Sequence, residues 1–319
     1  MGPAVTDSSA TPTRLASLTT HMQGLLQDAL APSTQAAYKR TWEMLTNFCT
    51  QLGVDCSLPT RVATLALFIT DLDQKGYAPA TISSHVSAIG YVHKLNGWSD
   101  PTPSFLVQKL LGACHKKNRQ TDVRLPIEKP ILGKLIHATN YTIERKDHRS
   151  LFKAMFSLAF HAFLRVGEMT ASAGHVSKNT IHLEQLAVQP SNMKLTFKSY
   201  KHSKGQPFTL TIQAAPLAPD CPVRIMQEYL AGRGSSSGPL FQFRPNCPVT
   251  RANFNTQLRH ALQFCQLPTD RYKSHSFRIG AATEASRQGL SDSQIRQLGR
   301  WQSDAFTSYI RVSQRLSSL

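Results

Sequence analysis

Apolar residues recur at helical spacing through the first third of the chain, from Ser33 onward. The first run starts behind a Ser33-Thr34 cap and ends at Gly53. Its apolar residues share one helical face: Tyr38, Trp42, Leu45, Cys49 and Leu52. Similar runs follow Pro59 and Pro79, and a last one starts near Ser104. These successive amphipathic helices predict a small helical bundle over residues 31–118.

The second part of the chain, residues 131–319, mixes two periods. Helical spacing covers residues 131–139 and 148–164, and it returns over 222–229, 250–265, 275–288, 291–298 and 303–314. Residues 194–198 and 207–212 instead alternate apolar with polar, as half-buried strands do, and residues 200–206 between them read as a turn. The pattern therefore predicts a domain that is mainly α with a small antiparallel β-sheet.

Two segments lack either period. Residues 1–30 are rich in Ser, Thr, Ala and Pro, and their only cluster of large apolar residues is Leu25, Leu26 and Leu30. We expect most of this segment to be a flexible N-terminal arm. Residues 119–130 are polar and contain Pro126 and Pro130, which predicts a linker between the bundle and the second domain.

Charge narrows the choice of partner. The 319 residues hold 36 Lys and Arg against 19 Asp and Glu, a formal charge of +17, and the pI is near 9.9. Such an excess favours a polyanion, and nucleic acid is the commonest one. The excess is uneven, because residues 191–206 contain no acidic residue and four lysines: Lys194, Lys198, Lys201 and Lys204.

Other classes of protein lose support. The six cysteines form no C-x-x-C pair and no His/Cys cluster at zinc spacing, so we expect reduced thiols, no metal and no cofactor. The most apolar run, residues 151–164, is short and contains Lys153, Ser157 and His161. It therefore predicts a buried core helix, and we expect no membrane association. The N-terminus does not resemble a signal peptide.

The predicted bundle carries side chains suited to phosphate contact. The helix after Pro79 has a hydroxyl-rich face that includes Thr81 and Ser84, and the last helix ends in a basic segment with Lys116, Lys117 and Arg119. Small hydroxyls and terminal cations position a protein on a duplex without reading its sequence. A solvated surface explains any one of these residues equally well.

The last third of the chain concentrates residues that suit phosphodiester chemistry. His275 and Arg278 lie three positions apart at a predicted helix start, so both project from one face, and Tyr309 follows later. Cleaving a phosphodiester without a metal requires cations on the non-bridging oxygens, a proton donor and a nucleophile able to form an ester. Arginine is planar, permanently charged and bidentate toward phosphate. Taken singly, an H-x-x-R pair is typical of a helix surface and a tyrosine is typical of packing.

The order of these residues changes that assessment. The chain carries Arg165-Val-Gly-Glu168, the phrase His275-Ser-Phe-Arg-Ile-Gly-Ala-Ala-Thr, and Leu-Gly-Arg300-Trp301 before Tyr309. From about Ser33 to the end it resembles the tyrosine recombinase (phage integrase) family, and most of all the DIRS and Crypton recombinases of eukaryotic mobile elements. The resemblance implies a SAM-like helical core-binding domain and a catalytic domain with the DNA breaking-rejoining fold, at 131–319. It also implies site-specific recombination or integration through a 3′-phosphotyrosine, without metal or ATP.

The resemblance assigns roles by position. Arg165 and Arg278 would clamp the scissile phosphate, Glu168 would support the turn of the first arginine, and His275 would assist proton movement around the nucleophile Tyr309. A lysine of the β-hairpin would be the general acid. Lys201 lies nearest the turn and is our choice, with Lys198 and Lys204 as alternatives that otherwise contact DNA.

One position departs from the family pattern. The family's histidine or tryptophan precedes the tyrosine by nine positions, which here falls on Arg300, whereas Trp301 lies one residue later. Either residue can fill this position in the sequence, and both are candidates for the site.

The implied partner is double-stranded DNA, with four protomers assembling on two duplexes. The mobile-element resemblance further implies a nuclear location, or the cytoplasm and nucleoid in a prokaryote. Alternatives remain open: a recombinase-derived DNA-binding protein without activity, a type IB topoisomerase-like enzyme, and a telomere resolvase. A relaxing enzyme works as a monomer, so assembly and covalent chemistry distinguish these classes.

Overall fold

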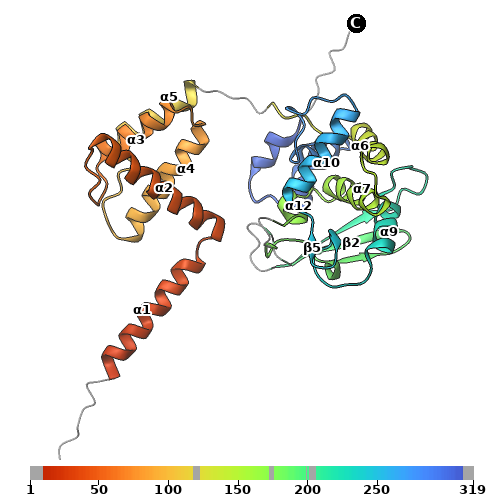
Figure 1. The fold of residues 1–319 in the computed structure, drawn as a ribbon, viewed down its shortest axis with the longest axis horizontal. Coiled ribbons are helices and arrows are strands. Elements are labelled where there is room, and N and C mark those ends of the chain that lie inside the picture. The colour runs from red at the N-terminus through yellow and green to blue at the C-terminus, as the bar shows by residue number, and fades with distance from the viewer. Residues whose placement is uncertain (1–9, 118–122, 172–175, 199, 201–205, 312–319) are drawn as a thin grey trace, which may run out of the picture. The chain divides into compact units, whose positions relative to one another are not determined.

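The computed structural model describes residues 10–117, 123–171, 176–198, 200 and 206–311. The chain divides into two compact units, Met1–Thr121 and Asp122–Leu319 (Figure 1). Each unit has a hydrophobic core of its own. In the described residues, no helix combines the length and the apolar character that crossing a bilayer requires.

In the described part of the first unit, residues 10–117, every regular element is a helix. Its elements are α1 (Ala10–Asp28), α2 (Pro32–Leu52), α3 (Val62–Gln74), α4 (Pro79–Leu95) and α5 (Phe105–Lys117). Helices α2 to α5 pack around a core of aliphatic and aromatic side chains that includes Leu45, Phe48, Leu65, Phe68, Ile82 and Ile89. Proline occupies the first helical turn of both α2 and α4, where its missing N–H has no intrahelical partner to lose.

Helix α1 lies in the segment that we expected to be a flexible arm. Its apolar side chains are exposed, among them Leu15, Leu18, Met22 and Leu25. Its sequence has good helix formers, Ala, Leu, Met and Gln, at many positions, and intrinsic propensity does not require a packed face. Because the whole segment has little periodic hydrophobicity, the sequence pattern did not predict this helix.

The second unit contains helices and two small sheets. Its helices are α6 (Lys129–Thr142), α7 (Lys146–His161), α8 (Val166–Met169), α9 (Pro222–Arg233), α10 (Arg251–Phe264), α11 (Ser276–Arg287) and α12 (Asp292–Gly299), with 3₁₀ turns η1 (Leu183–Gln185) and η2 (Asp304–Tyr309). Helix α7 is buried over most of its length and packs against α6, α9 and α11. It is the central element of this unit, as the run at 151–164 predicted.

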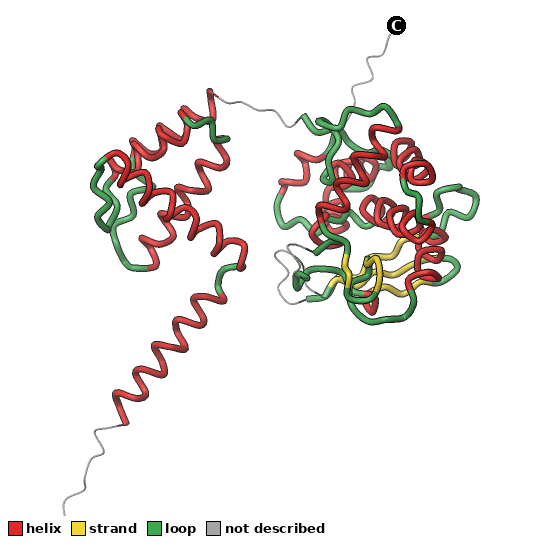
Figure 2. Tube along the Cα trace, viewed as in Figure 1, coloured by secondary structure: helices red, strands yellow, loops and turns green. Residues whose placement is uncertain are grey.

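The sheets are antiparallel. Strands β1 (Leu186–Val188), β2 (Asn192–Phe197) and β3 (Phe208–Gln213) form one sheet in that order, and β4 (Gln242–Arg244) pairs with β5 (Cys247–Pro248) in another. In the register of β2 and β3, Leu195 lies opposite Leu210 and Phe197 opposite Phe208. Figure 2 shows the strands gathered at one side of the unit, with helices forming the rest. This arrangement confirms the predicted fold class and the predicted pairing of the two alternating runs.

The second half of the expected linker is part of the second unit. The backbone N–H groups of Leu125 and Ile127 donate to the carbonyls of Arg271 and Ser276, at 2.9 and 3.0 Å. Ile127 is fully buried. A Cβ on Gly280 of α11 would stand 1.8 Å from the Ile127 carbonyl oxygen, so only glycine permits this approach. The two prolines and the polar residues around them led us to predict a linker. The structure shows an extended segment that packs against the rest of the second unit.

The end of the chain also differs from expectation. Helical spacing predicted a helix over 303–314, but in the described part of that range, residues 303–311, the structure has only the short turn η2. Hydroxyl groups compete for its backbone: Thr307 Oγ1 donates to the Asp304 carbonyl at 2.7 Å, and Ser308 Oγ donates to the Ala305 carbonyl at 2.7 Å. The segment that carries Tyr309 is therefore held by side chains and not by a continuous helical ladder.

Candidate functional site

A turn after α7 supplies the first elements of the site. Phe163 adopts a left-handed backbone with φ of 51°, which is uncommon outside glycine and costs free energy. Two residues later Arg165 is the N-cap of α8, and its backbone N–H donates to Glu168 Oε2 at 2.7 Å. Glu168 is buried, and its other oxygen lies 3.6 Å from Arg165 Nη1. The carboxylate thus fixes the start of α8 and the arginine beside it.

Arg278 enters the same place from α11. It is fully buried, and its two terminal nitrogens donate to the carbonyls of Phe163 and Gly299. Its guanidinium lies over the ring of Trp301, 4.1 Å from the centroid. Burial, together with the positive charges of Arg165 and Arg300, lowers the pKa of Arg278 to about 9. At neutral pH the group still carries its charge.

Arg300 reaches the cluster from the end of α12. Its backbone is left-handed with φ of 55°, and its Nη2 lies 3.1 Å from Glu168 Oε2. The same nitrogen donates to the Phe163 carbonyl at 3.4 Å, and the guanidinium lies 3.8 Å above the Phe197 ring of β2. Burial is the main cause that lowers the pKa of Arg300, and Glu168 opposes it.

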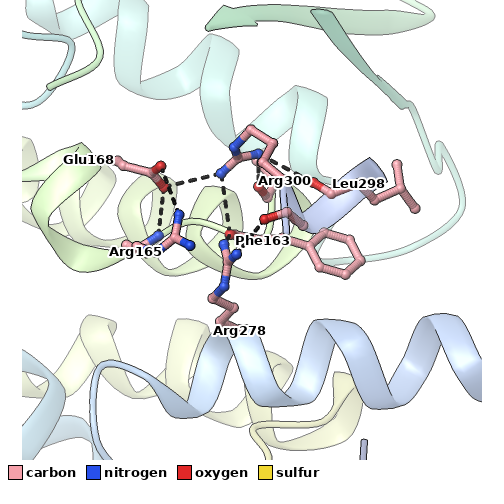
Figure 3. A network of polar contacts seen from close by, with 8 residues as sticks. Phe163, Arg165, Glu168, Arg278, Leu298 and Arg300 are labelled. Carbon is pink, nitrogen blue, oxygen red and sulfur yellow. Dashed lines mark hydrogen bonds and ion pairs between the residues drawn. The ribbon is translucent and has the colours of Figure 1, made fainter. Parts of the chain in front are cut away.

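The cluster carries excess positive charge and unused donors. Figure 3 shows Arg165 and Arg300 turned toward the Glu168 carboxylate, with Arg278 rising toward Phe163 from the helix below. Three guanidinium groups meet one carboxylate, which leaves a local charge of +2. Within the part of the chain that the structure describes, Arg165 Nη1, Arg278 Nε and Arg300 Nε are buried and make no hydrogen bond. Buried cationic donors without acceptors are unfavourable unless an anion completes them, so the cluster is built for an anionic ligand.

Tyr309 stands next to this cluster. Its ring centroid is 5.0 Å from that of His275 and 5.4 Å from that of Trp301. Trp301 also lies against Arg278, so the same indole contacts both the arginine and the phenol. Tyr309 is half-buried, and Phe306 of the same turn is fully buried against Trp301. A tyrosine, a histidine and a cluster of buried arginines therefore share one region of the second unit.

The structure separates the two candidates for the position before the tyrosine. Arg300 faces Glu168, Phe197 and Phe163, whereas Trp301 contacts Tyr309 and Arg278. Gly299 makes this possible, because a Cβ there would lie 1.5 Å from the Trp301 ring. Both residues belong to the cluster: Arg300 lies beside Glu168, and Trp301 lies beside Tyr309.

Of the other expected residues, the structure describes five. Lys198 is exposed and its Nζ is 3.6 Å from Glu184 Oε1, while Lys201 and Lys204 lie outside the described residues, as does Arg119. Thr81, Ser84, Lys116 and Lys117 are exposed in the first unit. Ser84 Oγ donates to the Ala80 carbonyl at 2.8 Å, and Lys117 Nζ lies 2.9 Å from Asp73 Oδ2.

Sequence reasoning missed three contributors. Phe163 acts through a backbone carbonyl and Phe197 through its ring, and neither residue type signals such a use. Thr283 of α11 contacts the backbone around Tyr309, and its only signal was its place in the phrase after His275. Among the residues that the structure describes, no three His, Cys, Asp or Glu side chains are grouped to hold a metal ion.

Comparison with known proteins places this site in a family. Residues 131–315 match the phage integrase family, and the chain belongs to that family. The chain is 23% identical over 300 residues to the recombinase Cre of Escherichia phage P1. The alignment covers 87% of this chain and 85% of Cre.

Solved structures show the same fold at low identity. The lambda integrase (75–356) dimer bound to a COC′ core site matches with a TM-score of 0.59 and 13% identity, over 93% of this chain and 95% of that one. The XerH site-specific recombinase bound to a palindromic difH substrate, in a post-cleavage complex, matches with a TM-score of 0.57 and 13% identity, over 79% and 69%. The fold expected from the resemblance is thereby confirmed.

Proposed function

We propose that the protein is a site-specific DNA recombinase of the integrase type, which breaks and rejoins DNA through a 3′-phosphotyrosine without metal or ATP. The observation that carries the proposal is the arginine cluster with three unused buried donors, next to a tyrosine 5.0 Å from a histidine. Membership of the phage integrase family and the likeness to Cre support it.

The chemistry follows from these groups. A backbone phosphate of DNA brings one negative charge, which Arg165 and Arg278 bind. The Tyr309 oxygen loses its proton and attacks phosphorus, and the bond to the 5′ oxygen of the next nucleotide breaks. That oxygen takes up a proton and leaves as a 5′-hydroxyl. Because one phosphate ester replaces another, the bond energy is kept, and attack by a 5′-hydroxyl reverses the reaction.

The remaining residues serve these steps. Glu168 keeps Arg165 and Arg300 in place, and Arg300 adds positive charge behind the phosphate site. His275 assists proton movement near Tyr309 and holds a phosphate oxygen. The proton donor to the leaving oxygen is a lysine of the β2–β3 hairpin. We favour Lys201 because Lys198 is engaged with Glu184, and Lys204 is the other alternative.

The partner is double-stranded DNA. Thr81, Ser84, Lys116, Lys117 and Arg119 of the first unit, with Lys198 and Lys204 of the second, contact phosphates that position the duplex. Each released counterion makes the affinity depend on salt, so duplex affinity should fall steeply as salt increases. A flat response would contradict extensive phosphate contact. We further propose that four protomers assemble on two duplexes, because strand exchange requires two cleaved sites.

The source and location are finer proposals. The phrases around His275 and before Tyr309 support kinship with recombinases of eukaryotic mobile elements, and with it a nuclear location. Imaging the tagged full chain in eukaryotic cells tests this location. A uniformly cytoplasmic protein would contradict it.

A covalent adduct tests the central proposal. The full chain is incubated with a library of randomised duplexes, each nicked so that a cleaved strand diffuses away, in buffer with EDTA. Protein-linked DNA should form, and sequencing it defines the site. Tyr309→Phe should form none while it still binds the recovered duplex. Binding without adduct in the parent protein would indicate a DNA-binding protein that has lost its activity. Adduct with plasmid relaxation but no exchange between duplexes would indicate a topoisomerase.

A further inference from the structure

One threonine holds the backbone that directly follows the tyrosine side chain. Thr283 Oγ1 donates to the Tyr309 carbonyl at 3.2 Å and accepts from the Arg311 N–H at 3.0 Å. Thr283 is fully buried on α11, two turns beyond His275 and on the helix that carries Arg278. A single hydroxyl therefore connects the phosphate-binding helix to the segment of the nucleophile.

This contact replaces secondary structure that the segment lacks. Turn η2 ends at Tyr309, and Ile310 continues in an extended conformation with φ of −76° and ψ of 115°. The Tyr309 carbonyl and the Arg311 N–H would otherwise extend a helical ladder. Both are satisfied by Thr283 instead, and a buried polar group of the backbone needs such a partner. The position of Tyr309 is set by α11 as well as by its own turn.

We propose that Thr283 is a positioning residue for the nucleophile: its hydroxyl fixes the distance between Tyr309 and the phosphate held by Arg278. The proposal rests on the proposed function. A hydroxyl is required because the group must donate and accept at once, which serine can do and valine cannot. Displacement of a reacting group by about 1 Å can cost on the order of 100-fold in rate.

Paired variants test both ends of the contact. Thr283→Val keeps the shape and removes the hydroxyl, whereas Thr283→Ser keeps the hydroxyl. Arg311→Pro removes the N–H without altering α11, and the extended backbone of Ile310 already suits a residue before proline. Arg311→Ala controls for the loss of the arginine side chain. Thr139→Val controls for the loss of a buried hydroxyl, because Thr139 is fully buried on α6 and its Oγ1 donates to the Ile136 carbonyl of the same helix at 2.7 Å.

The measured quantity is the rate of adduct formation at saturating protein, on the duplex recovered above. We expect Thr283→Val to slow it by about 10-fold to 100-fold and Arg311→Pro by about 10-fold, with duplex affinity unchanged within about 2-fold. Thr283→Ser, Arg311→Ala and Thr139→Val should stay within about 3-fold of the parent. The two slow substitutions combined should be no slower than Thr283→Val alone, because Thr283→Val already removes the hydrogen bond that Arg311→Pro removes.

Other outcomes would overturn the proposal. Thr283→Val at the parent rate, or Thr283→Ser as slow as Thr283→Val, would show that the hydroxyl does not position Tyr309. If Thr283→Val does not fold, equal rates for Arg311→Pro and Arg311→Ala would also show that the contact does not position Tyr309. Hydrogen exchange of the Arg311 amide tests the contact independently of the proposed function. It should be slow in the parent and fast in Thr283→Val even if no adduct forms.

Discussion

Arg300 and Glu168 form a buried ion pair at 3.1 Å between residues 132 positions apart in the chain. The same carboxylate oxygen accepts the backbone N–H of Arg165 at 2.7 Å. One acidic side chain thus holds the turn of one arginine and the guanidinium of another, and it is the counter-charge to a cluster of three.

Removal of that counter-charge should destabilise the second unit. Glu168→Gln keeps the shape but leaves the three arginines without a carboxylate. Losing one partner of a buried ion pair costs about 3 to 5 kcal/mol. Denaturant unfolding of the full chain measures the loss in the transition of the second unit. Glu184→Gln is the control, because its exposed pair with Lys198 should contribute at most about 1 kcal/mol. Equal effects of the two changes would contradict a structural use of Glu168.

Arg278→Lys should separate catalysis from binding. Lysine keeps a charge but cannot reach the Phe163 and Gly299 carbonyls together, nor lie flat against Trp301. Adduct formation should fall by about 10² to 10³, the usual loss when a preorganised donor is removed. Duplex affinity, measured by titration, should change little because other cations supply it. Arg287→Lys on the same helix is the control, and its rate should match the parent. A parallel collapse of binding would make Arg278 a general affinity residue.

The contact between α11 and the segment before α6 should tolerate no side chain. Gly280→Ala places a Cβ 1.8 Å from the Ile127 carbonyl oxygen, so the helix or the segment must move. Overpacking of this kind costs about 1 to 3 kcal/mol or more, and thermal unfolding should report a lower Tm. Gly232→Ala in α9 meets nothing within 4 Å and should instead be neutral or gain up to about 1 kcal/mol. A lower Tm for both would contradict the prediction, because the loss at Gly280 could then not be assigned to the contact with Ile127.

Stabilisation by an anion should depend on pH through Arg278. Inorganic phosphate should raise the Tm of the full chain, because it supplies an acceptor for the cluster. Below pH about 9 Arg278 is protonated and can bind the anion, and above its lowered pKa of about 9 it loses that charge. The gain in Tm should therefore decrease as pH rises through about 9, and a bound anion shifts the decrease upward. Arg278→Gln should show a smaller gain and no such step. If Arg278→Gln showed the same decrease in the Tm gain near pH 9, lysines and not Arg278 would account for the decrease.

Much of the fold follows from periodicity. The buried run of α7 and the alternating runs that pair as β2 and β3 were both readable, because side-chain period alone distinguishes a helix from a strand. The turn η2 was not, since its Ser and Thr hydroxyls bond the local backbone and Thr283 captures what remains. The spacing of apolar residues in 303–314 does not reveal contacts with a helix that is distant in the sequence.

The site was predictable only in its side-chain chemistry. The spacing of His275 and Arg278 placed both on one helix start, and the resemblance added Arg165, Glu168 and Tyr309. Whether Arg300 or Trp301 occupies the position before the tyrosine depends on the left-handed backbone of Arg300, which arginine rarely adopts and which turns the two side chains to opposite sides of the cluster. Local sequence could not reveal that conformation.

Phe163 offers its carbonyl oxygen to both Arg278 and Arg300. A peptide oxygen is a dipole with no net charge, so it can orient two cations and cancel neither. A second carboxylate in its place would hold the guanidinium groups as firmly but would reduce the attraction left for an incoming polyanion. The uncommon backbone at this phenylalanine thus presents a carbonyl oxygen that holds two guanidinium groups and leaves their positive charge in place. An additional acidic residue would neutralise part of that charge.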